Sequence, residues 1–520
     1  MKSSQLSESR YLLPENITKK DFLDNFGQSF TVKAAKASNE KFTIVDSFEW
    51  GIYQAGMLAI RHQDNSIRLY KENSLLDSDA SLDIGKINAR SRFWWDFPDS
   101  PAREILKKIL DLRALYPVFN GLLKIENYNL EDQDGKILVM CQLVSIASPE
   151  KPRTPLMRQV KLVPVTGYKL ENQQAIDLLA QLGAFKPSLK PLDSLLGALG
   201  VSPQPYTVKP KLRLSPDAPA RSSISIIIAI MIEKQRLTEQ GVIKDIDTEF
   251  LHHFRVATRM IRAAIVQLKE VFPAPDVTML KDRFGAIGRE TNRLRDLDVF
   301  ILDKHRYMGL LPASLRDGLL PMFDDFEQAR SQEVKRIAQW LSSKAYRLEI
   351  EELQALFQQG YSAIETEWSE KPTIELAVNK IQHRYRKIQK AAAKITHDTP
   401  DDDIHSIRID CKKLRYLLYF FDGLFNKKQV KVAGNHLKAL QDRLGIFNDL
   451  SVQGEFLENY LNEEEHKAGK DILLIASLGG LISSLNTMHI QERENCIREL
   501  AIFSNEENRQ LFKDTFVIQS

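Results

Sequence analysis

The stretch "LHHFRVATRMIRAAIVQLK" (Leu251–Lys269) carries two histidines, three arginines and a lysine but no acidic residue. Its apolar residues recur at helical spacing, so the stretch predicts an amphipathic helix. Surface helices usually alternate acidic and basic side chains, because opposite charges four residues apart stabilise a helix and like charges destabilise it. The unbalanced cations therefore suggest that this helix faces an anion supplied from outside.

The same pattern recurs 153 residues later, in "IHSIRIDCKKLRYLLYFF" (Ile404–Phe421). Both stretches have the spacing H-x2-R-x3-[RK]-x2-R, and the matched positions are His252, Arg255, Arg259 and Arg262 in the first copy and His405, Arg408, Lys412 and Arg415 in the second. A second landmark, "LRDLDV" (Leu294–Val299), lies 153 residues before "FNDLSV" (Phe447–Val452). Agreement of both landmarks without a gap predicts a duplicated helical module.

The four basic positions of each copy form one stripe on their helix. At about 100° per residue they lie within an arc of roughly 80° and span about 15 Å of the helix axis. Phe254, Ile261 and Ile265 lie near the opposite side and supply the core face. Asp296 and Asp449, in the second landmark, are interpreted as groups that orient a basic residue. We expect the two halves to face each other around a pseudo-twofold axis, so that both stripes point into a shared cavity.

A further basic helix is predicted at "HRYRKIQKAAAKI" (His383–Ile395), just before the second copy. Arg384 and Lys387 share one of its faces, and Lys234 lies 153 residues before Lys387. We expect these three residues to add charge to the same cavity; a solvated helix face is the alternative. The acidic run "PDDDIH" (Pro400–His405) is interpreted as a helix start, with Thr399 as the N-cap and Pro400 as the first helical residue, rather than as a metal site.

Length and composition indicate a soluble protein of more than one domain. A chain of 520 residues is too long for a single core. The net charge is only +3, so any preference for anions must come from local clusters. The three cysteines show no disulfide or metal spacing, which fits a reducing cytosol. The apolar runs 225–232 and 472–488 are too short to span a bilayer and are predicted to be buried helices. We therefore expect a cytoplasmic protein without membrane insertion.

The chain divides into two parts of different fold class. Residues 1–200 mix strand-like runs, such as "GKILVMCQLVSI" (Gly135–Ile146) and "RQVKLVPVTGY" (Arg158–Tyr168), with helical ones, which predicts an α+β domain. Residues 201–217 form a Pro-rich linker. Residues 218–520 are predicted to be all-α, with repeat 1 at about 218–370 and repeat 2 at about 371–520.

The two basic stretches and their landmarks resemble the paired signatures of the CHAD family (conserved histidine α-helical domain), over roughly residues 218–520. The resemblance implies two pseudo-symmetric antiparallel four-helix bundles with a basic channel between them. It also implies that the channel binds inorganic polyphosphate, with polyphosphate granules as a further partner, and no catalytic chemistry is established for such domains. We expect no cofactor and no catalytic residues. The family's histidine and basic positions fall on the eight stripe residues. Met260, where the family often has a second arginine, and Asn292, where it commonly has glycine, depart from the pattern.

Residues 1–200 are similar to the CYTH family in two stretches. "VDSFEWGIYQAGMLAIR" (Val45–Arg61) resembles the CYTH stretch that contains D-T and ends in L-R-x-R. "ESRYLLP" resembles the opening E-x-E-x-K, with Glu8 retained, Arg10 at the lysine position and Leu6 at the first glutamate. A triphosphate-cleaving CYTH enzyme needs carboxylates to hold Mg²⁺ or Mn²⁺, and most are missing here. The sequence therefore predicts a degenerate CYTH-like domain, with an unrelated α+β domain as the alternative.

Three other functions remain open from the sequence. The first is hydrolysis of triphosphates by the N-terminal domain, although the missing carboxylates predict no such enzyme. The second is binding of RNA or DNA, which usually requires aromatic side chains for base stacking, and only Tyr416 neighbours a stripe. The third is a helical scaffold for a protein partner.

Overall fold

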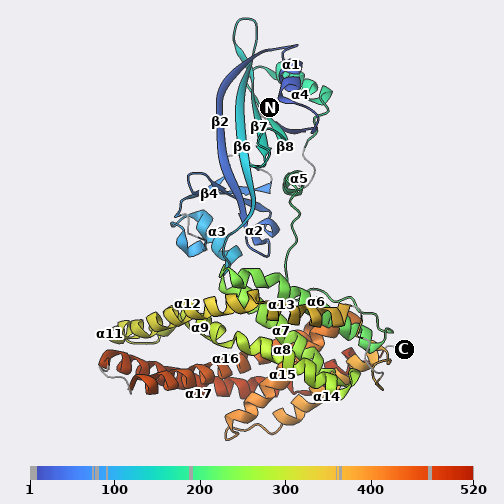
Figure 1. The fold of residues 1–520 in the computed structure, drawn as a ribbon, viewed down its shortest axis with the longest axis vertical. Coiled ribbons are helices and arrows are strands. Elements are labelled where there is room, and N and C mark those ends of the chain that lie inside the picture. The colour runs from blue at the N-terminus through green and yellow to red at the C-terminus, as the bar shows by residue number, and fades with distance from the viewer. Residues whose placement is uncertain are drawn as a thin grey trace. The chain divides into compact units, whose positions relative to one another are not determined.

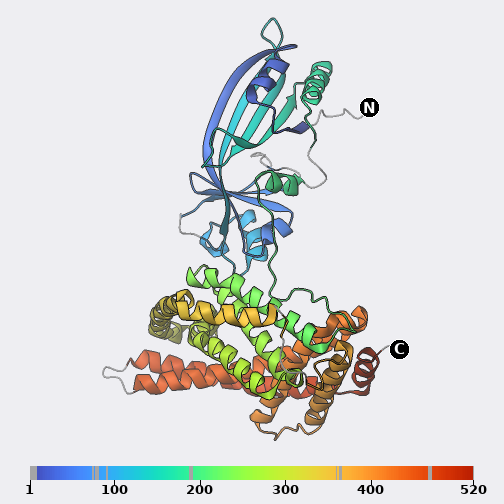
Figure 2. The same cartoon turned by 45° about the vertical axis from the view of Figure 1, so that its right-hand side comes forward.

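The computed structural model describes residues 9–72, 75, 81–88, 92–186, 191–358, 360–361, 366–465 and 471–518. The chain forms two compact units, Met1–Thr207 and Val208–Ser520 (Figures 1 and 2). The first contains an antiparallel sheet with short helices, and the second is helical. The prediction of an α+β domain followed by an all-α domain is confirmed.

The first unit is built on one antiparallel sheet with the strand order β1-β8-β7-β6-β2-β3-β4-β5. Its strands are β1 (Ser9–Leu13), β2 (Thr31–Asp46), β3 (Met57–His62), β4 (Ser66–Lys71), β5 (Leu82–Lys86), β6 (Tyr116–Glu131), β7 (Ile137–Ala147) and β8 (Pro155–Pro164). The long strands β2 and β6 pair along most of their length and form the curved centre of the sheet (Figure 1). The two predicted strands correspond to β7 and β8.

Short helices cover different parts of this sheet. They are α1 (Lys19–Phe26), α2 (Gly51–Gln54), α3 (Pro101–Leu110), α4 (Lys169–Gln181) and α5 (Pro191–Ala198). Helices α1 and α4 share one core with β6, β7 and β8, whereas α2 and α3 share another with β3, β4 and β5. Of the CYTH-like opening, Leu6 and Glu8 lie outside the described residues. Arg10 lies in β1 and donates a hydrogen bond to the Leu75 carbonyl at 2.6 Å.

The helices of the second unit repeat with the spacing found in the sequence. The first half contains α6 (Ala220–Ile243), α7 (Thr248–Gln267), α8 (Ala274–Glu290), α9 (Asn292–Leu302), α10 (Lys304–Gly309), α11 (Ala313–Arg316), α12 (Leu320–Ser342) and α13 (Lys344–Gln358). The second contains α14 (Thr373–Ala392), α15 (Asp401–Phe421), α16 (Lys427–Glu465), α17 (Ile472–Phe503) and α18 (Glu506–Thr515). Helices α14, α15 and α16 each begin 153 residues after α6, α7 and α8, respectively.

The two halves are joined by a shared hydrophobic core. Leu297 and Phe300 of α9 and Phe323 of α12 belong to the same cluster as Leu457 of α16 and Leu478 of α17. Helices α16 and α17 lie side by side over much of their length (Figures 1 and 2). The halves are therefore not independent bundles, because side chains from both complete this core.

Helix α17 is longer than the apolar run that predicted it. It spans 32 residues and, by length and composition, is the one helix of the described residues that could cross a membrane. A core helix meets the same criteria, and Leu474, Leu478, Leu481 and Leu485 all lie in the shared core. Ile472 and Ile490 remain exposed. The expected buried helix is thus buried along one face only.

The two stripe helices begin differently. In α7, the buried Asp247 is the N-cap, and its Oδ1 accepts hydrogen bonds from the backbone N–H groups of Glu249 and Phe250 at 3.0 and 3.2 Å. In α15 the N-cap is Pro400, not Thr399 as predicted. The Thr399 hydroxyl instead accepts a hydrogen bond from the Thr396 N–H at 2.8 Å, so it is used in the preceding turn.

Replacing Asp247 with alanine is expected to lower the free energy of unfolding by about 1 kcal/mol, because two N–H groups at the start of α7 lose their acceptor. Asp403 in the first turn of α15 is exposed, and Asp403→Ala is the matched control, with an expected change of at most about 0.5 kcal/mol. Urea denaturation followed by circular dichroism measures both. Equal effects of the two substitutions would contradict the capping role.

Candidate functional site

The two predicted stripe helices, α7 and α15, contact each other and enclose a pocket of about 280 Å³. Half of the ten residues that line this pocket are basic: Arg259, Arg262, Arg408, Lys412 and Lys413. The remaining lining residues are Ala263, Val266, Gln267, Ile409 and Tyr416. None is acidic. We call this the α7–α15 pocket.

The direction in which each basic stripe faces is set by the core residues of its own helix. Phe254, Ile261 and Ile265 of α7 are fully buried, as are Cys411 and Leu414 of α15. Because a helix turns through about 100° per residue, burying these positions turns the basic stripe of each helix away from its core. The stripes meet where the two helices contact each other. Hydrophobic packing thus holds five cationic side chains around one small pocket.

The nearest carboxylates pair with the edges of this cluster. Asp449 of α16 lies 3.5 Å from the Arg408 guanidinium, and its own side chain is well exposed. Asp410 lies 3.7 Å from the Lys413 ammonium but is closer to two cations of α14. Among the described residues, no carboxylate forms an ion pair with Arg259, Arg262 or Lys412. Most of the positive charge in the pocket is therefore uncompensated by the protein.

Two arginines of the pocket also have unused hydrogen-bond donors. The Nε atoms of Arg262 and Arg408 are buried and have no hydrogen-bond partner among the described residues. A buried donor without an acceptor costs free energy, on the order of 1–3 kcal/mol. An anion with several oxygen atoms would provide acceptors for them.

The clustering of cations changes their protonation. Burial, together with Arg408, Arg259 and Arg415, lowers the pKa of Lys412 to about 8. Burial and the nearby Arg259 also lower the pKa of Arg408, although Asp449 acts in the opposite direction. A bound anion would raise both pKa values again, because it favours the charged forms.

The sequence predicted eight stripe residues in one cavity, and the structure brings four of them to the pocket: Arg259, Arg262, Arg408 and Lys412. Arg255 and Arg415 lie beside these four, since both interact electrostatically with them. His252 packs beside the His253 ring at the start of α7, and His405 is exposed at the start of α15. Neither histidine lines the pocket. The stripes are longer than the region where the two helices contact each other, so their first positions lie outside it.

Arg255 has a structural role that the sequence did not indicate. One of its Nη atoms donates to the Thr291 hydroxyl at 2.8 Å, the Asn292 side-chain oxygen at 2.9 Å and the Gly288 carbonyl at 3.2 Å. These acceptors lie where α8 ends and α9 begins. Burial and the cation of Arg259 lower the pKa of Arg255 to about 10. Arg255 thus ties α7 to the α8–α9 junction.

The additional basic residues expected in the cavity do not line the pocket. Arg384 and Lys387 of α14 form ion pairs with the buried Asp410, at 2.6 and 3.0 Å. Both residues therefore share one carboxylate, which offsets only part of their combined charge. Lys234 of α6 is half-buried and lies 3.9 Å from Glu233.

Two basic residues near the site were missed. Lys413 lines the pocket; it follows Lys412 directly and lies outside the repeated spacing. Lys209 belongs to the Pro-rich stretch, and the next residue, Pro210, accepts a hydrogen bond from the Tyr419 hydroxyl of α15 at 2.8 Å. Partial desolvation and the cations Arg415 and Arg259 lower the pKa of Lys209. Only the fold could show that this segment crosses α15. In the sequence, the one available signal was a lysine between two prolines of the linker.

The described residues of the CYTH-like stretches are not grouped as a metal site would require. Asp46 is buried and accepts hydrogen bonds from the backbone N–H groups of Ser47, Ile52 and Tyr53 at 2.7–2.9 Å, so it holds the turn before α2. Among the described residues, no group of three or more His, Cys, Asp or Glu side chains could hold a metal ion. The donors that Mg²⁺ or Mn²⁺ requires are therefore not assembled in this part of the chain.

The fold and the site define the second unit as a helical domain with two repeated halves and a basic pocket where their equivalent helices meet. Residues 227–458 match the family model of the CHAD domain, so the chain contains a CHAD domain. Among solved structures, it is similar to the crystal structure of the CHAD domain from the plant Ricinus communis, with 25% identity, a TM-score of 0.48 and coverage of 56% of this chain and 95% of that one. It is also similar to PptA from Streptomyces chartreusis, with 13% identity, a TM-score of 0.41 and coverage of 55% and 100%. No curated protein matches the chain.

Replacing Lys412 with methionine is expected to stabilise the protein by about 1 kcal/mol, because it removes a half-buried cation that forms no ion pair among the described residues. The folded-state pKa of about 8 lies below the usual 10.5, so the charge of Lys412 destabilises the fold fully below pH 8. This penalty fades as the pH rises from 8 to 10.5. The stability gap between the variant and the wild type should therefore shrink over that range.

Thermal denaturation at several pH values measures this gap. Lys413→Met is the matched control, since Lys413 has Asp410 as a counter-ion and its removal should not stabilise the fold. A less stable Lys412→Met protein at pH 7 would show that the cluster is not under electrostatic strain.

Proposed function

We propose that the second unit binds inorganic polyphosphate in the α7–α15 pocket and along the stripes on either side of it. The observation that carries this proposal is a pocket with five basic lining residues and no acidic one. The resemblance to the CHAD family supports polyphosphate as the anion. Arginine suits such a ligand, because its planar guanidinium pairs with two phosphate oxygens at once.

The arrangement favours a linear anion over a compact one. The pocket of about 280 Å³ accommodates only a short piece of a phosphate chain. Arg415 and Lys209 extend the positive charge beyond Lys412 at one end. A chain of repeating negative charges can contact the pocket and this extension together, whereas a single phosphate cannot.

Two alternative functions have less support. A single-stranded nucleic acid needs aromatic surfaces for its bases, and Tyr416 is the one aromatic residue that lines this pocket. Hydrolysis of triphosphates by the first unit would need carboxylates around a divalent cation, and the described residues do not group them in this way.

We further propose that the protein acts in the cytoplasm, where polyphosphate granules would supply the ligand. Cys141, Cys411 and Cys496 are buried and free, and no disulfide occurs among the described residues. Free thiols are the usual state in a reducing compartment.

The combined replacement of Arg259, Arg408 and Lys412 with alanine is expected to weaken polyphosphate binding by about 100-fold, because three direct phosphate contacts are lost. By analogy with nucleic acids, the slope of log affinity against log salt should fall by about 2. Calorimetry or gel shift with polyphosphate of defined length, across a salt series, measures both quantities.

The matched control removes the same charge elsewhere in the second unit. Arg386, Lys438 and Arg498 are exposed and belong to α14, α16 and α17, and none lines the pocket. Their combined replacement with alanine should change affinity less than about threefold, through net charge alone. A folded pocket variant that binds as tightly as this control would refute the assignment of the site.

Polyphosphate binding is also expected to take up protons near pH 8. Lys412 is only partly protonated there, because its pKa is about 8, and the bound anion raises that pKa. Binding should therefore consume roughly half a proton at pH 8, and affinity should fall by about five- to tenfold between pH 7 and pH 9. Calorimetry in buffers of different ionisation enthalpy measures the proton uptake.

Lys412→Arg is the control for this titration. Arginine retains its charge over this range, so the variant should bind polyphosphate without proton uptake near pH 8. Proton release on binding by the wild type, or unchanged uptake by the variant, would contradict the role given to Lys412.

A further inference from the structure

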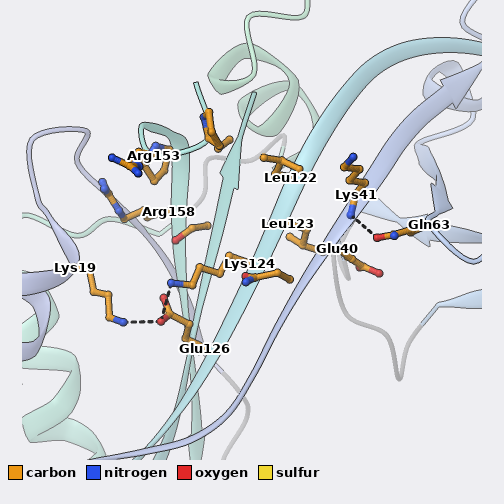
Figure 3. A pocket seen from close by; sticks show the side chains of 15 residues that line it. Lys19, Glu40, Lys41, Gln63, Leu122, Leu123, Lys124, Glu126, Arg153 and Arg158 are labelled. Carbon is orange, nitrogen blue, oxygen red and sulfur yellow. Dashed lines mark hydrogen bonds and ion pairs between the residues drawn. The ribbon is translucent and has the colours of Figure 1, made fainter. Parts of the chain in front are cut away.

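A second, larger cavity lies within the first unit, on one face of its sheet (Figure 3). Its volume is about 650 Å³, which is in the range of pockets that bind small molecules. Strands β2, β6, β7 and β8 all contribute lining residues, and Lys19 at the start of α1 joins them.

The register of the sheet explains why these side chains meet. Asn39, Lys124, Ser145 and Arg158 lie directly opposite one another on β2, β6, β7 and β8. Directly opposed residues of an antiparallel sheet point to the same face. All four line the cavity. The charged residues are thus placed by strand pairing, not by flexible loops.

The neighbouring row gives the cavity an apolar wall. Lys41 on β2 is opposed by Leu122 on β6, which is opposed by Ala147 on β7 and then by Pro155 on β8. All four also line the cavity. One part of the wall is therefore polar and basic, and the part beside it is mostly aliphatic.

The cavity has an excess of positive charge. Its five basic lining residues are Lys19, Lys41, Lys124, Arg153 and Arg158, and its two acidic ones are Glu40 and Glu126. Lys41 and Arg153 are exposed, and neither forms an ion pair among the described residues. Glu40 lies 3.2 Å from the His62 ring, where it is directed toward β3.

Glu126 is the buried acidic residue of this cavity, and its carboxylate pairs with two lysines. Its Oε1 lies 2.5 Å from the Lys19 Nζ and 3.1 Å from the Lys124 Nζ. Figure 3 shows both lysine side chains directed toward this carboxylate. The hydrogen bonds from Lys19 and Lys124 outweigh burial and lower the pKa of Glu126, so it remains ionised. Its Oε1 is committed to the two lysines, and their positive charges make this position a poor fit for a divalent cation.

We propose that this cavity binds a small organic anion with two or more charged groups, directly through its lysines and arginines and without a divalent cation. In this proposal Glu126 is an internal counter-ion. An anionic group of the ligand displaces it from Lys19 and Lys124, and the aliphatic wall contacts the uncharged part of the ligand. The proposal is independent of polyphosphate binding by the second unit.

The role of Glu126 gives a test whose sign separates this site from a metal site. As an internal competitor, Glu126 weakens anion binding, so Glu126→Gln should tighten it by about three- to tenfold in buffer freed of metal ions by a chelating resin. As a metal ligand it would have the opposite effect, and the substitution would weaken binding that depends on Mg²⁺ or Mn²⁺.

The experiment is calorimetry on the full chain with citrate and with fructose 1,6-bisphosphate, in buffer freed of metal ions by a chelating resin and again in Mn²⁺. These probes present carboxylate and phosphate groups, respectively, and the response of either one supports the proposal and identifies the acid group. Absence of binding by both probes would overturn it. So would binding that requires Mn²⁺ or that Glu126→Gln weakens.

A second variant avoids buried groups, in case Glu126→Gln fails to fold. The combined change Lys41→Ala and Arg153→Ala replaces two exposed cations and should weaken probe binding by about tenfold. Lys108 and Lys169 are exposed and do not line the cavity, so their replacement with alanine is the matched control. Equal affinities of these two double variants would overturn the proposal.

The same measurements are repeated in the chain with Arg259, Arg408 and Lys412 replaced by alanine. The effect of Glu126→Gln on probe binding should be unchanged there, since the two sites belong to different units. An effect that disappears in this background would assign the probes to the second unit and overturn the proposal. Loss of polyphosphate binding alone would leave it intact.

Discussion

The α7–α15 pocket depends on hydrophobic packing that keeps like-charged side chains close together despite their repulsion. Burial, together with the neighbouring cations of Arg408 and Arg259, lowers the pKa of Lys412 to about 8. Two such helices would separate if they were held only by their polar faces. They remain together because Phe254, Ile261 and Leu414 are fully buried in the helical cores. The cores supply the stability that the charged contact lacks.

The two halves of the repeat use equivalent arginines differently. Arg255 donates to the side-chain oxygens of Thr291 and Asn292, at the break between α8 and α9. The positions 153 residues later hold Leu444 and Gly445, which have no side-chain oxygen, and α16 continues there without a break. Arg408, the counterpart of Arg255, therefore has no such acceptors and lines the pocket instead. The repeat thus places an arginine at the same position in each half, but their neighbours differ. Arg255 stabilises the fold, whereas Arg408 lines the pocket.

The sequence predicted the fold class and the two stripe helices because both depend on local patterns. Helical periodicity, the 153-residue spacing and alternating strands are visible without knowledge of packing. The contact region of α7 and α15 is not visible in this way, since it depends on how the shared core sets their positions. The sequence therefore placed His252 and His405 with the other stripe residues. For the same reason it could not pair Arg384 with Asp410, or place Lys209 beside Arg415.

The two basic cavities of this chain differ in how far carboxylates of the protein offset their positive charge. In the sheet of the first unit, Lys19 and Lys124 share the carboxylate of Glu126, so the protein already supplies part of the negative charge. In the second unit, Arg259, Arg262 and Lys412 have no carboxylate partner among the described residues, and two arginine Nε donors are buried without an acceptor. A ligand of the first cavity must exchange with an internal ion pair, which favours a few well-placed charges. A ligand of the second meets uncompensated charge, which favours a long polyanion and makes binding sensitive to salt.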